Sequence, residues 1–234
     1  MAEWMLEVLR TEQKYPVSFL EAERMNALLG AVLHPDPHNG MNGYLVRSLY
    51  FDTPDNADYR DKEDGLELRR KLRLRIYGPD AQTAKLELKE KQGDDQRKRS
   101  LVLSREDAMA LCAGDPDVLR KQDSEFALEL YSRIRQQNYL PKCIVEYDRR
   151  AFVVAENDIR ITLDSGLRAN EANLDLFDPN LNCYPVGELG LVTMEVKFNR
   201  FLLSYVKDLV SLSNRTQASV SKYCAARVAS LGGL

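Results

Sequence analysis

The stretch "KLRLRIYG", residues 71–78, alternates cations with apolar side chains over its first six positions. Its cations are Lys71, Arg73 and Arg75, and each is followed by Leu or Ile. Because successive side chains of a β-strand point to opposite faces, this pattern predicts a strand with one apolar face and one cationic face. A fold that contains this strand must pack the first face and balance a row of positive charge on the second.

The same alternation recurs in four more segments that are predicted as strands, at residues 5–15, 84–91, 159–164 and 193–198. One such strand is typical of a half-exposed antiparallel sheet, in which polar residues face water. Five of them need another explanation, because like charges opposite one another across strands destabilise a sheet. The residues predicted to share the charged face are Arg10, Glu12, Lys14, Lys71, Arg73, Arg75, Lys85, Glu87, Lys89, Lys91, Arg160, Thr162, Asp164, Glu195 and Lys197.

An anionic ligand would balance this charged face. If the sheet closes into a barrel, the cations line a tunnel, where they are costly without a partner. Arginine can hold phosphate oxygens through two N–H groups at once, and lysine supplies a compact positive charge. The sequence therefore predicts a polyanion bound inside the sheet.

The order of elements predicts an α+β fold, and the 234 residues suffice for one large domain or two small ones. Helices are expected at 18–33, where Ser18 and Glu21 form a capping box, and at 104–111, 123–137 and 201–230. Consecutive strands joined by tight turns favour an antiparallel sheet of about eight strands. Besides the five charged segments, strands are expected near residues 44–52, 97–103 and 142–154.

Composition limits the classes of function. The 234 residues carry a formal net charge of -3, which does not favour general binding of nucleic acid, although residues 67–99 hold eleven Lys or Arg against six Asp or Glu. The four cysteines are scattered, which argues against a structural zinc site and is typical of reduced thiols. No apolar run approaches the roughly 20 residues of a membrane helix. We therefore expect a cytoplasmic protein without a membrane segment, and the sequence leaves its oligomeric state open.

Two glutamates stand among the cations of the charged face. Glu195 and Glu12 can each form an ion pair with a lysine two residues away, Lys197 and Lys14. Alternatively, they hold a divalent cation together with phosphate oxygens, which is the usual arrangement for Mg²⁺ or Mn²⁺ on a triphosphate. Both histidines, His34 and His38, lie in a segment rich in Pro and Gly, which predicts a solvated loop.

Eight short motifs of this chain occur in the order seen in a known family. They are "RTEQKY" (10–15), "SLYFDTPD" (48–55), "KLRLRIYG" (71–78), "LELKEK" (86–91), "YDRRAF" (147–152), "IRITLDSGLRA" (159–169), "MEVKF" (194–198) and "SKY" (221–223). Together they resemble the vacuolar transporter chaperone (VTC) domain, the polyphosphate-polymerase branch of the triphosphate tunnel metalloenzymes. The resemblance covers nearly the whole chain and implies a single domain over residues 1–234, built as an eight-stranded antiparallel β-barrel with helices packed outside. It also implies ATP or polyphosphate as ligand, with Mg²⁺ or Mn²⁺.

The resemblance also implies roles for residues that match the family's motifs. The predicted catalytic residues are Arg73, Arg75, Arg149, Arg160 and Lys89. The predicted substrate-binding residues are Arg10, Lys14, Lys98, Lys197 and Lys222, with Arg97 and Arg99 as alternatives to Lys98. The predicted metal ligands are Glu195 and Glu12.

One position departs from the wider superfamily. Its first strand carries Glu-x-Glu-x-Lys, whereas this chain has Arg10 at the first of these positions. This departure disfavours a relative of the thiamine-triphosphatases or adenylate cyclases and removes one carboxylate that could hold a metal. Polyphosphate synthesis from ATP is the leading hypothesis. The alternatives are a triphosphatase, with water as acceptor, a polyphosphate-binding module without turnover, and hydrolysis of RNA 5'-triphosphates, which the overall charge disfavours.

Overall fold

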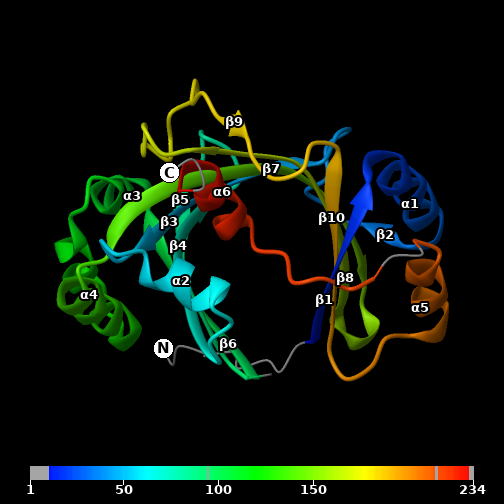
Figure 1. Ribbon diagram of the computed structural model, residues 1–234, viewed down its shortest axis with the longest axis horizontal. Coiled ribbons are helices and arrows are strands. Elements are labelled where there is room, and N and C mark those ends of the chain that lie inside the picture. Colours follow the sequence, from blue (N-terminus) through cyan, green and yellow to red (C-terminus); the bar gives the residue numbers. More distant parts are fainter. Residues whose placement is uncertain (1–10, 94, 214–215, 232–234) are drawn as a thin grey trace.

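The computed structural model describes residues 11–93, 95–213 and 216–231 (Figure 1), so Arg10 lies outside the described residues. The strands are β1 (Thr11–Ser18), β2 (His34–Pro35), β3 (Tyr44–Asp52), β4 (Leu68–Ile76), β5 (Thr83–Gln92), β6 (Asp95–Ser104), β7 (Leu140–Val154), β8 (Ile159–Asn170), β9 (Tyr184–Pro185) and β10 (Leu191–Phe198). The α-helices are α1 (Phe19–Val32), α2 (Ala57–Glu63), α3 (Arg105–Cys112), α4 (Glu125–Gln137), α5 (Ser204–Ser211) and α6 (Lys222–Leu231). Two short 3₁₀ helices, Pro116–Lys121 and Glu156–Asp158, complete the described elements.

Eight strands pair in the order β1-β10-β8-β7-β3-β4-β5-β6, and every pairing is antiparallel. The sheet curls into a half-barrel whose ends are β1 and β6 (Figure 1), and no pairing in the described part of the chain joins these two strands. Pro16 lies in β1, where a residue without an N–H is tolerated because the strand is at an edge. The predicted eight-stranded antiparallel fold with outer helices is confirmed.

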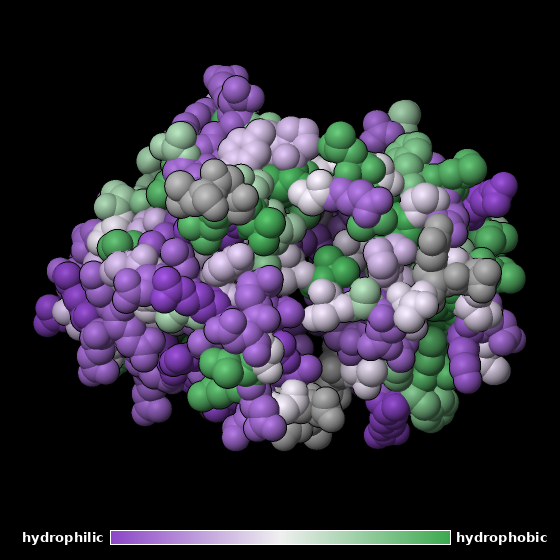
Figure 2. Space-filling model, in the orientation of Figure 1, coloured by the Kyte–Doolittle hydropathy of each residue, from purple (hydrophilic) through white to green (hydrophobic). Residues whose placement is uncertain are grey.

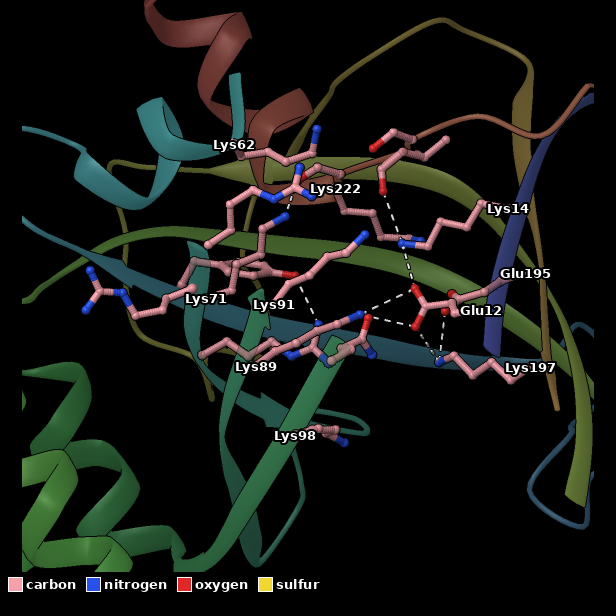
Figure 3. A pocket seen from close by; sticks show the side chains of 18 of the residues that line it. Glu12, Lys14, Lys62, Lys71, Lys89, Lys91, Lys98, Glu195, Lys197 and Lys222 are labelled. Carbon is pink, nitrogen blue, oxygen red and sulfur yellow. Dashed lines mark hydrogen bonds and ion pairs between the residues drawn. The ribbon is translucent and has the colours of Figure 1, made fainter. Parts of the chain in front are cut away.

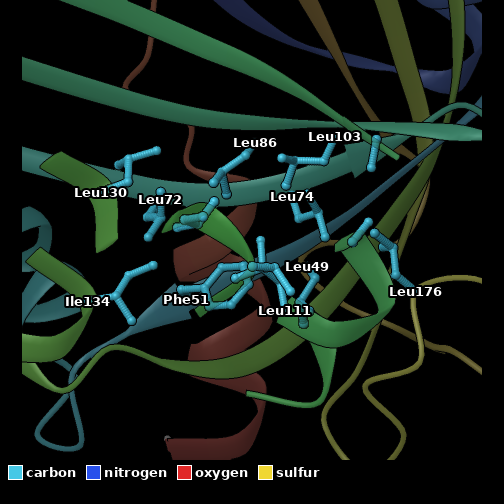
Figure 4. Packing of buried hydrophobic residues seen from close by; sticks show 14 of the residues in the cluster. Leu49, Phe51, Leu72, Leu74, Leu86, Leu103, Leu111, Leu130, Ile134 and Leu176 are labelled. Atoms are coloured by element: carbon cyan, nitrogen blue, oxygen red, sulfur yellow. The ribbon is translucent and has the colours of Figure 1, made fainter. Parts of the chain in front are cut away.

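The apolar residues of the opening stretch face the outer helices. Leu72, Leu74 and Ile76 of β4 are at most 1% exposed and pack with Leu86 of β5 and residues of α3 and α4 (Figure 4). Leu111 of α3 and Leu130 of α4 belong to this cluster. Its burial fixes the register of β4, because a shift by one residue would exchange the leucines with the cations.

A second cluster covers the outside of β1, β8 and β10. Met25 and Leu29 of α1 and Val206 of α5 pack there against Ile161 and Val196. The predicted capping box at the start of α1 is confirmed, since Ser18 Oγ accepts from the Glu21 N–H and the Glu21 carboxylate accepts from the Ser18 N–H. With both sets of helices outside, the charged residues are left on the concave face of the sheet. Among the described residues, every helix is too short or too polar to span a bilayer.

The predicted single helix over residues 201–230 is wrong. Two helices, α5 and α6, are separated by a stretch in which residues 216–221 have no regular structure. This stretch contains Thr216, Ser219 and Ser221, whose hydroxyl groups compete with helical hydrogen bonds. Ser221 instead caps α6, because its Oγ accepts from the Cys224 N–H. The N-terminus of α6 is thereby placed over the concave face (Figure 1).

A buried pair of aspartates connects β3, α2 and α6. Asp52 accepts hydrogen bonds from the Asp58 and Tyr59 N–H groups and from the Tyr223 hydroxyl, the last at 2.7 Å. Asp58 is 1% exposed, and its carboxylate oxygens accept from the Tyr139 hydroxyl at 2.9 and 3.0 Å. Burial, followed by the neighbouring Asp52 carboxylate, raises the pKa of Asp58 to about 7. The hydrogen bond from Tyr223 to Asp52 therefore holds α6 against β3. The nearby Asp52 carboxylate disfavours ionisation of Asp58.

Asp58→Asn is expected to stabilise the protein at neutral pH. In the wild type the folded-state pKa of about 7 exceeds the ordinary value, so ionisation opposes folding. The wild type therefore loses stability as pH rises from about 4 to about 7, and the variant does not incur this loss. The measurement is urea unfolding at pH 4, 5.5 and 7.5, with exposed Asp55→Asn as control. A difference between Asp58→Asn and the wild type that does not grow over this pH range would contradict the assignment.

Candidate functional site

The concave face of the half-barrel encloses a cavity of about 640 Å³ (Figure 3). Figure 2 shows a hollow near the middle of the molecule. Thirteen of its 23 lining residues are Lys or Arg, against two glutamates. A concentration of positive charge on a chain with a net charge of -3 indicates a binding site for an anion with several charges.

Ten of the twelve predicted site residues line this cavity. They are Glu12, Lys14, Arg73, Arg75, Lys89, Lys98, Arg149, Glu195, Lys197 and Lys222. They come from β1, β4, β5, β6, β7, β10 and α6, so residues more than 200 positions apart in sequence meet there. Lys98 is the one of the three candidates on β6 that lines the cavity, whereas Arg99 pairs with Glu90 and Glu129 on the helical side.

Arg160 does not line the cavity. It lies opposite Lys197 in the β8–β10 register and thus on the concave face, but its guanidinium pairs with Asp36 at 2.7 Å and donates to the Tyr44 hydroxyl at 2.9 Å. Its predicted catalytic role stays a prediction. Arg10, predicted to bind substrate, cannot be placed because it lies outside the described residues.

Glu12 and Glu195 approach each other on neighbouring strands. Lys197 Nζ lies 2.8 Å from Glu195 Oε1 and 4.0 Å from Glu12 Oε2, and Glu12 also pairs with Lys14 at 3.0 Å and Lys89 at 3.1 Å. Burial alone would raise the pKa of Glu195, but Lys197, Lys14 and other nearby cations hold it well below its usual range. Both carboxylates are therefore ionised at neutral pH, and both readings of the sequence, ion pair and metal ligand, are compatible with this geometry.

Arg73 and Arg75 share one buried carboxylate. Glu87, which is 2% exposed, accepts from Arg73 Nε at 2.7 Å, lies 3.7 Å from Arg75 and pairs with Lys98. Burial opposes ionisation of Glu87, but these three cations hold its pKa well below the usual range. Tyr50 completes the arrangement, since its hydroxyl accepts from Arg73 Nη1 at 3.2 Å. Glu87 thus fixes the orientation of both arginines before any ligand arrives.

Asp164 has the same relation to Arg149 and Lys222. Its Oδ1 accepts from Arg149 Nε at 2.6 Å and its Oδ2 from Arg149 Nη2 at 2.7 Å, and Lys222 Nζ also lies 2.7 Å from Oδ2. Burial would raise the pKa of Asp164, but Lys222 and Arg149 lower it to about 2. Arg149 Nη1 carries two further N–H donors, because a guanidinium has five in all. The two hydrogen bonds to Asp164 orient the Arg149 guanidinium. In this orientation Arg149 Nη2 also lies 3.9 Å from Glu195 Oε2.

The segment 217–221 crosses the open side of the cavity. The Ala218 N–H donates to the Lys14 carbonyl at 2.9 Å, Lys14 Nζ donates to the Val220 carbonyl at 3.1 Å, and Lys71 Nζ donates to Ser221 Oγ at 2.5 Å. The segment therefore connects β1 to β4 across the concave face (Figures 1 and 3). Burial lowers the pKa of Lys71 to about 8, and burial with its lysine neighbours does the same for Lys89. A bound polyanion would raise the pKa of Lys71 and of Lys89 again, so that the two lysines would take up protons when it binds.

Several residues of the site were not among those predicted. Alternation placed Glu87 and Asp164 on the charged face, but nothing in the sequence showed that each would orient an arginine. Lys62 of α2 and the backbone of residues 217–221 line the cavity without any local signal, because their position depends on how α2 and α6 pack. Lys71 and Lys91 could have been assigned from the alternation alone.

A divalent cation would find two carboxylates here. Among the described residues, no group of three or more His, Cys, Asp or Glu is arranged to hold a metal ion. Glu12 and Glu195 nevertheless converge on the same lysine, and Mg²⁺ is commonly held by one or two carboxylates with the remaining ligands from phosphate and water. The donor set therefore fits a cation that arrives with a phosphate ligand.

Two solved structures share this fold over nearly their full lengths. A putative adenylate cyclase from Bacillus halodurans aligns with a TM-score of 0.55 and 15% identity, covering 92% of this chain and 94% of that one. A putative adenylyl cyclase from Hippeastrum, described as having a dominant triphosphatase activity, aligns with a TM-score of 0.56 and 14% identity, covering 94% and 96%. At such identities the likeness shows the fold alone.

The family can be assigned from the amino-acid sequence. A search among curated proteins found no significant match. The VTC domain, however, matches residues 9–231, which includes every described strand and helix. This chain therefore belongs to the VTC domain family.

Proposed function

We propose that this protein transfers the γ-phosphoryl group of ATP to the end of a polyphosphate chain. The observation that carries the proposal is the cavity itself, in which thirteen cations surround two ionised glutamates. The cations suit a ligand with many negative charges, and membership of the VTC domain family supports a polyphosphate or triphosphate as that ligand. The glutamates are the feature that a simple anion receptor does not need.

The arginines would bind and orient the triphosphate. Glu87 and Asp164 hold Arg73, Arg75 and Arg149 in place, so these groups need little rearrangement when charge develops on the transferring phosphoryl oxygens. Lys89, Lys98 and Lys222 would supply further positive charge around the same oxygens. Lys14 is held by Glu12 and by the Val220 carbonyl, which places it where the cavity is covered by residues 217–221.

The reaction needs no protein nucleophile. A terminal oxygen of the acceptor phosphate, already ionised, forms the new P–O bond as the bond from the γ-phosphorus to the bridging oxygen breaks and ADP leaves. Glu195 and Glu12 would hold a divalent cation, Mg²⁺ or Mn²⁺, which supplies charge neutralisation at the phosphate oxygens when bound. Segment 217–221 would limit access of water, so that phosphate competes as acceptor.

Triphosphate hydrolysis is the second candidate. The same residues would act on a triphosphate with water as the acceptor, and the Hippeastrum protein of the same fold is described with that activity. A binding module without turnover is the third candidate. It accounts for the cations but leaves Glu12 and Glu195 with ion pairing as their only role.

Product length separates these functions. Purified protein incubated with ATP and Mn²⁺, with and without a short polyphosphate primer, is expected to release ADP and form chains that lengthen with time. The products are resolved by gel electrophoresis, and free phosphate is measured in parallel. ADP with an equal amount of free phosphate and no chains would instead establish a triphosphatase. Tight binding of ATP with no ADP at any metal concentration would establish a binding module.

A further inference from the structure

A second, smaller hollow lies on the outer side of the sheet, between β4 and α4, and we refer to it as the outer hollow. It has a volume of about 250 Å³. One of its lining residues comes from β4 and the others from α4, and they are Arg70, Glu129, Ser132, Arg133, Gln136 and Gln137. Each of these side chains carries a polar group, so the outer hollow suits a polar ligand and not an apolar one.

Arg70 belongs to both hollows, since it lines the main cavity as well as the outer one. Its neighbour Arg69 lines the main cavity and lies opposite Lys91 in the β4–β5 register, whereas Arg70 lies opposite Glu90, which pairs with the helical side. β4 begins at Leu68, so Arg70 is close to the end of its strand. The main cavity and the outer hollow therefore meet at the Arg70 side chain, at one end of the sheet.

The Arg70 guanidinium has no close acceptor in the described part of the chain. Its Nε is buried without a hydrogen-bond partner. The carboxylate opposite it, Glu90, is already held, because Oε1 pairs with Arg133 at 3.2 Å and Oε2 with Arg99 at 3.1 Å. Asp58 interacts with the Arg70 charge only at longer range. A buried N–H donor without an acceptor is costly, and an anion in the outer hollow would supply the missing acceptor.

The outer hollow also carries an excess of positive charge. Arg99 and Arg133 each pair with the same two carboxylates, Glu90 and Glu129, so the charge of Arg70 is left uncompensated there. Both ion pairs of Arg133 are made by its Nη2. Because a guanidinium has five N–H donors, Arg133 can still offer the donors of Nη1 to a ligand. An oxyanion beside Arg70 and Arg133 would therefore find charge and donors on two sides.

The shared arginine favours a chain of phosphates over two separate anions. Lys62, Arg69 and Lys91 line the main cavity, and Arg69 is adjacent to Arg70 in sequence. A phosphate chain that leaves the cavity past these cations meets Arg70 next, and then the polar residues of α4. Once part of one chain is bound in the cavity, the next part binds from a high effective concentration. Two independent ions would not have this advantage.

We propose that Arg70, Ser132 and Arg133 form a second polyphosphate-binding site, outside the cavity, which holds the part of a long chain that extends beyond it. The inference rests on the proposed function, because it assumes that phosphates occupy the cavity. It adds a site that acts only on ligands too long for the cavity. Long chains then bind more tightly than short ones, and a growing chain stays attached between successive additions.

The test compares two ligands that differ in length. Binding of inorganic tripolyphosphate and of size-fractionated long-chain polyphosphate is measured by calorimetry without metal. Arg133→Gln and Ser132→Glu are each expected to weaken binding of the long chain about tenfold, the scale of one hydrogen bond to a charged group, and to change binding of tripolyphosphate less than about twofold. Ser132 is exposed, and Ser132→Glu keeps both ion pairs of Arg133, so this variant tests the site without removing a structural contact.

The matched control is Arg135→Gln. It removes the same charge two positions further along α4, where Arg135 pairs with Asp117 at 3.0 Å and does not line the outer hollow. Binding of both ligands is expected to stay unchanged in this variant. An equal loss in Arg135→Gln and Arg133→Gln would show that the long chain senses only the general surface charge, and would overturn the site.

The outcomes also separate this site from the proposed function. Equal losses for both ligands in Arg133→Gln and Ser132→Glu, or no loss for the long chain in either variant, would overturn the site. A loss confined to the long chain supports the site even where no ADP is released and the proposed function fails. A wild type that binds the long chain no more tightly than tripolyphosphate overturns the site alone, and a wild type that binds neither ligand overturns both.

Discussion

Glu195→Gln is expected to abolish metal-dependent ADP release while the protein still binds ATP. An amide is a much poorer ligand for a hard cation than a carboxylate, and the cation neutralises charge on the transferring phosphoryl group. A loss of about 100-fold or more in kcat is expected, which is the scale for removing one preorganised electrostatic contact. ATP binding without metal is expected to be unchanged or tighter, because one negative charge leaves the cavity. The measurement is ADP release against Mn²⁺ concentration, with calorimetry for ATP.

The control for Glu195→Gln is Glu106→Gln, an exposed residue of α3 on the outer side of the sheet. It is expected to leave both quantities unchanged. If Glu195 only pairs with Lys197, at 2.8 Å, the substitution removes one ion pair and turnover persists. Full activity in Glu195→Gln would therefore remove the metal assignment while the polymerase proposal remains.

Arg149→Ala is expected to lower kcat by about 100- to 1,000-fold, the cost of removing a group that stabilises developing charge. The substitution also leaves Asp164 buried and paired with Lys222 but without its bonds to Arg149, so some loss of stability is expected as well. Turnover is therefore measured at a temperature where unfolding, followed by circular dichroism, shows that the variant is folded. Activity is compared at saturating ATP, so that the loss is assigned to kcat.

The adjacent residue provides a matched control for Arg149. Arg150 lies on the other face of β7, where it pairs with Glu23 of α1 at 2.7 Å, outside the cavity. Arg150→Ala removes the same charge from the next position, and its expected effect is a loss of stability of at most about 1 kcal/mol with kcat unchanged. Similar activity in the two variants would show that the cavity does not carry the chemistry.

The sheet could be predicted because its two faces differ so strongly. In β4, apolar residues and cations alternate from Lys71 to Ile76, and in β5 Leu86 and Leu88 alternate with charged residues. The structure extends the predicted strand 84–91 by one residue at each end, and β4 ends at Ile76. The C-terminal region lacked such a signal. Its apolar residues Val206 and Val210 fit helix α5, but the break before Lys222 depends on hydrogen bonds from residues 217–221 to Lys14 and Lys71, which no local pattern encodes.

The cationic character of the site could be predicted, but its internal pairing could not. The alternation of charged and apolar residues predicts on which face of the sheet Glu87 and Asp164 lie. The motifs of the family indicate which arginines lie on that same face. Which acid orients which arginine depends on the curl of the sheet and on the placement of Lys222 by α6. Arg160 illustrates this limit, because its position on the charged face is as expected and yet Asp36, from the loop after β2, draws it away from the cavity.

The segment that crosses from β1 to β4 also determines when the site can form during synthesis on the ribosome. Lys14 and Val220 are separated by 206 positions, and β1 has β10 as its only strand partner among the described elements. Synthesis adds about 5–20 residues per second, so β1 emerges on the order of ten seconds or more before β10. In this interval Pro16, which has no N–H, reduces the hydrogen bonds that β1 can form with other strands. A nascent chain that ends before residue 217 lacks one wall of the cavity. The growing polypeptide therefore lacks the complete cavity, which forms only when nearly all of the described chain has emerged.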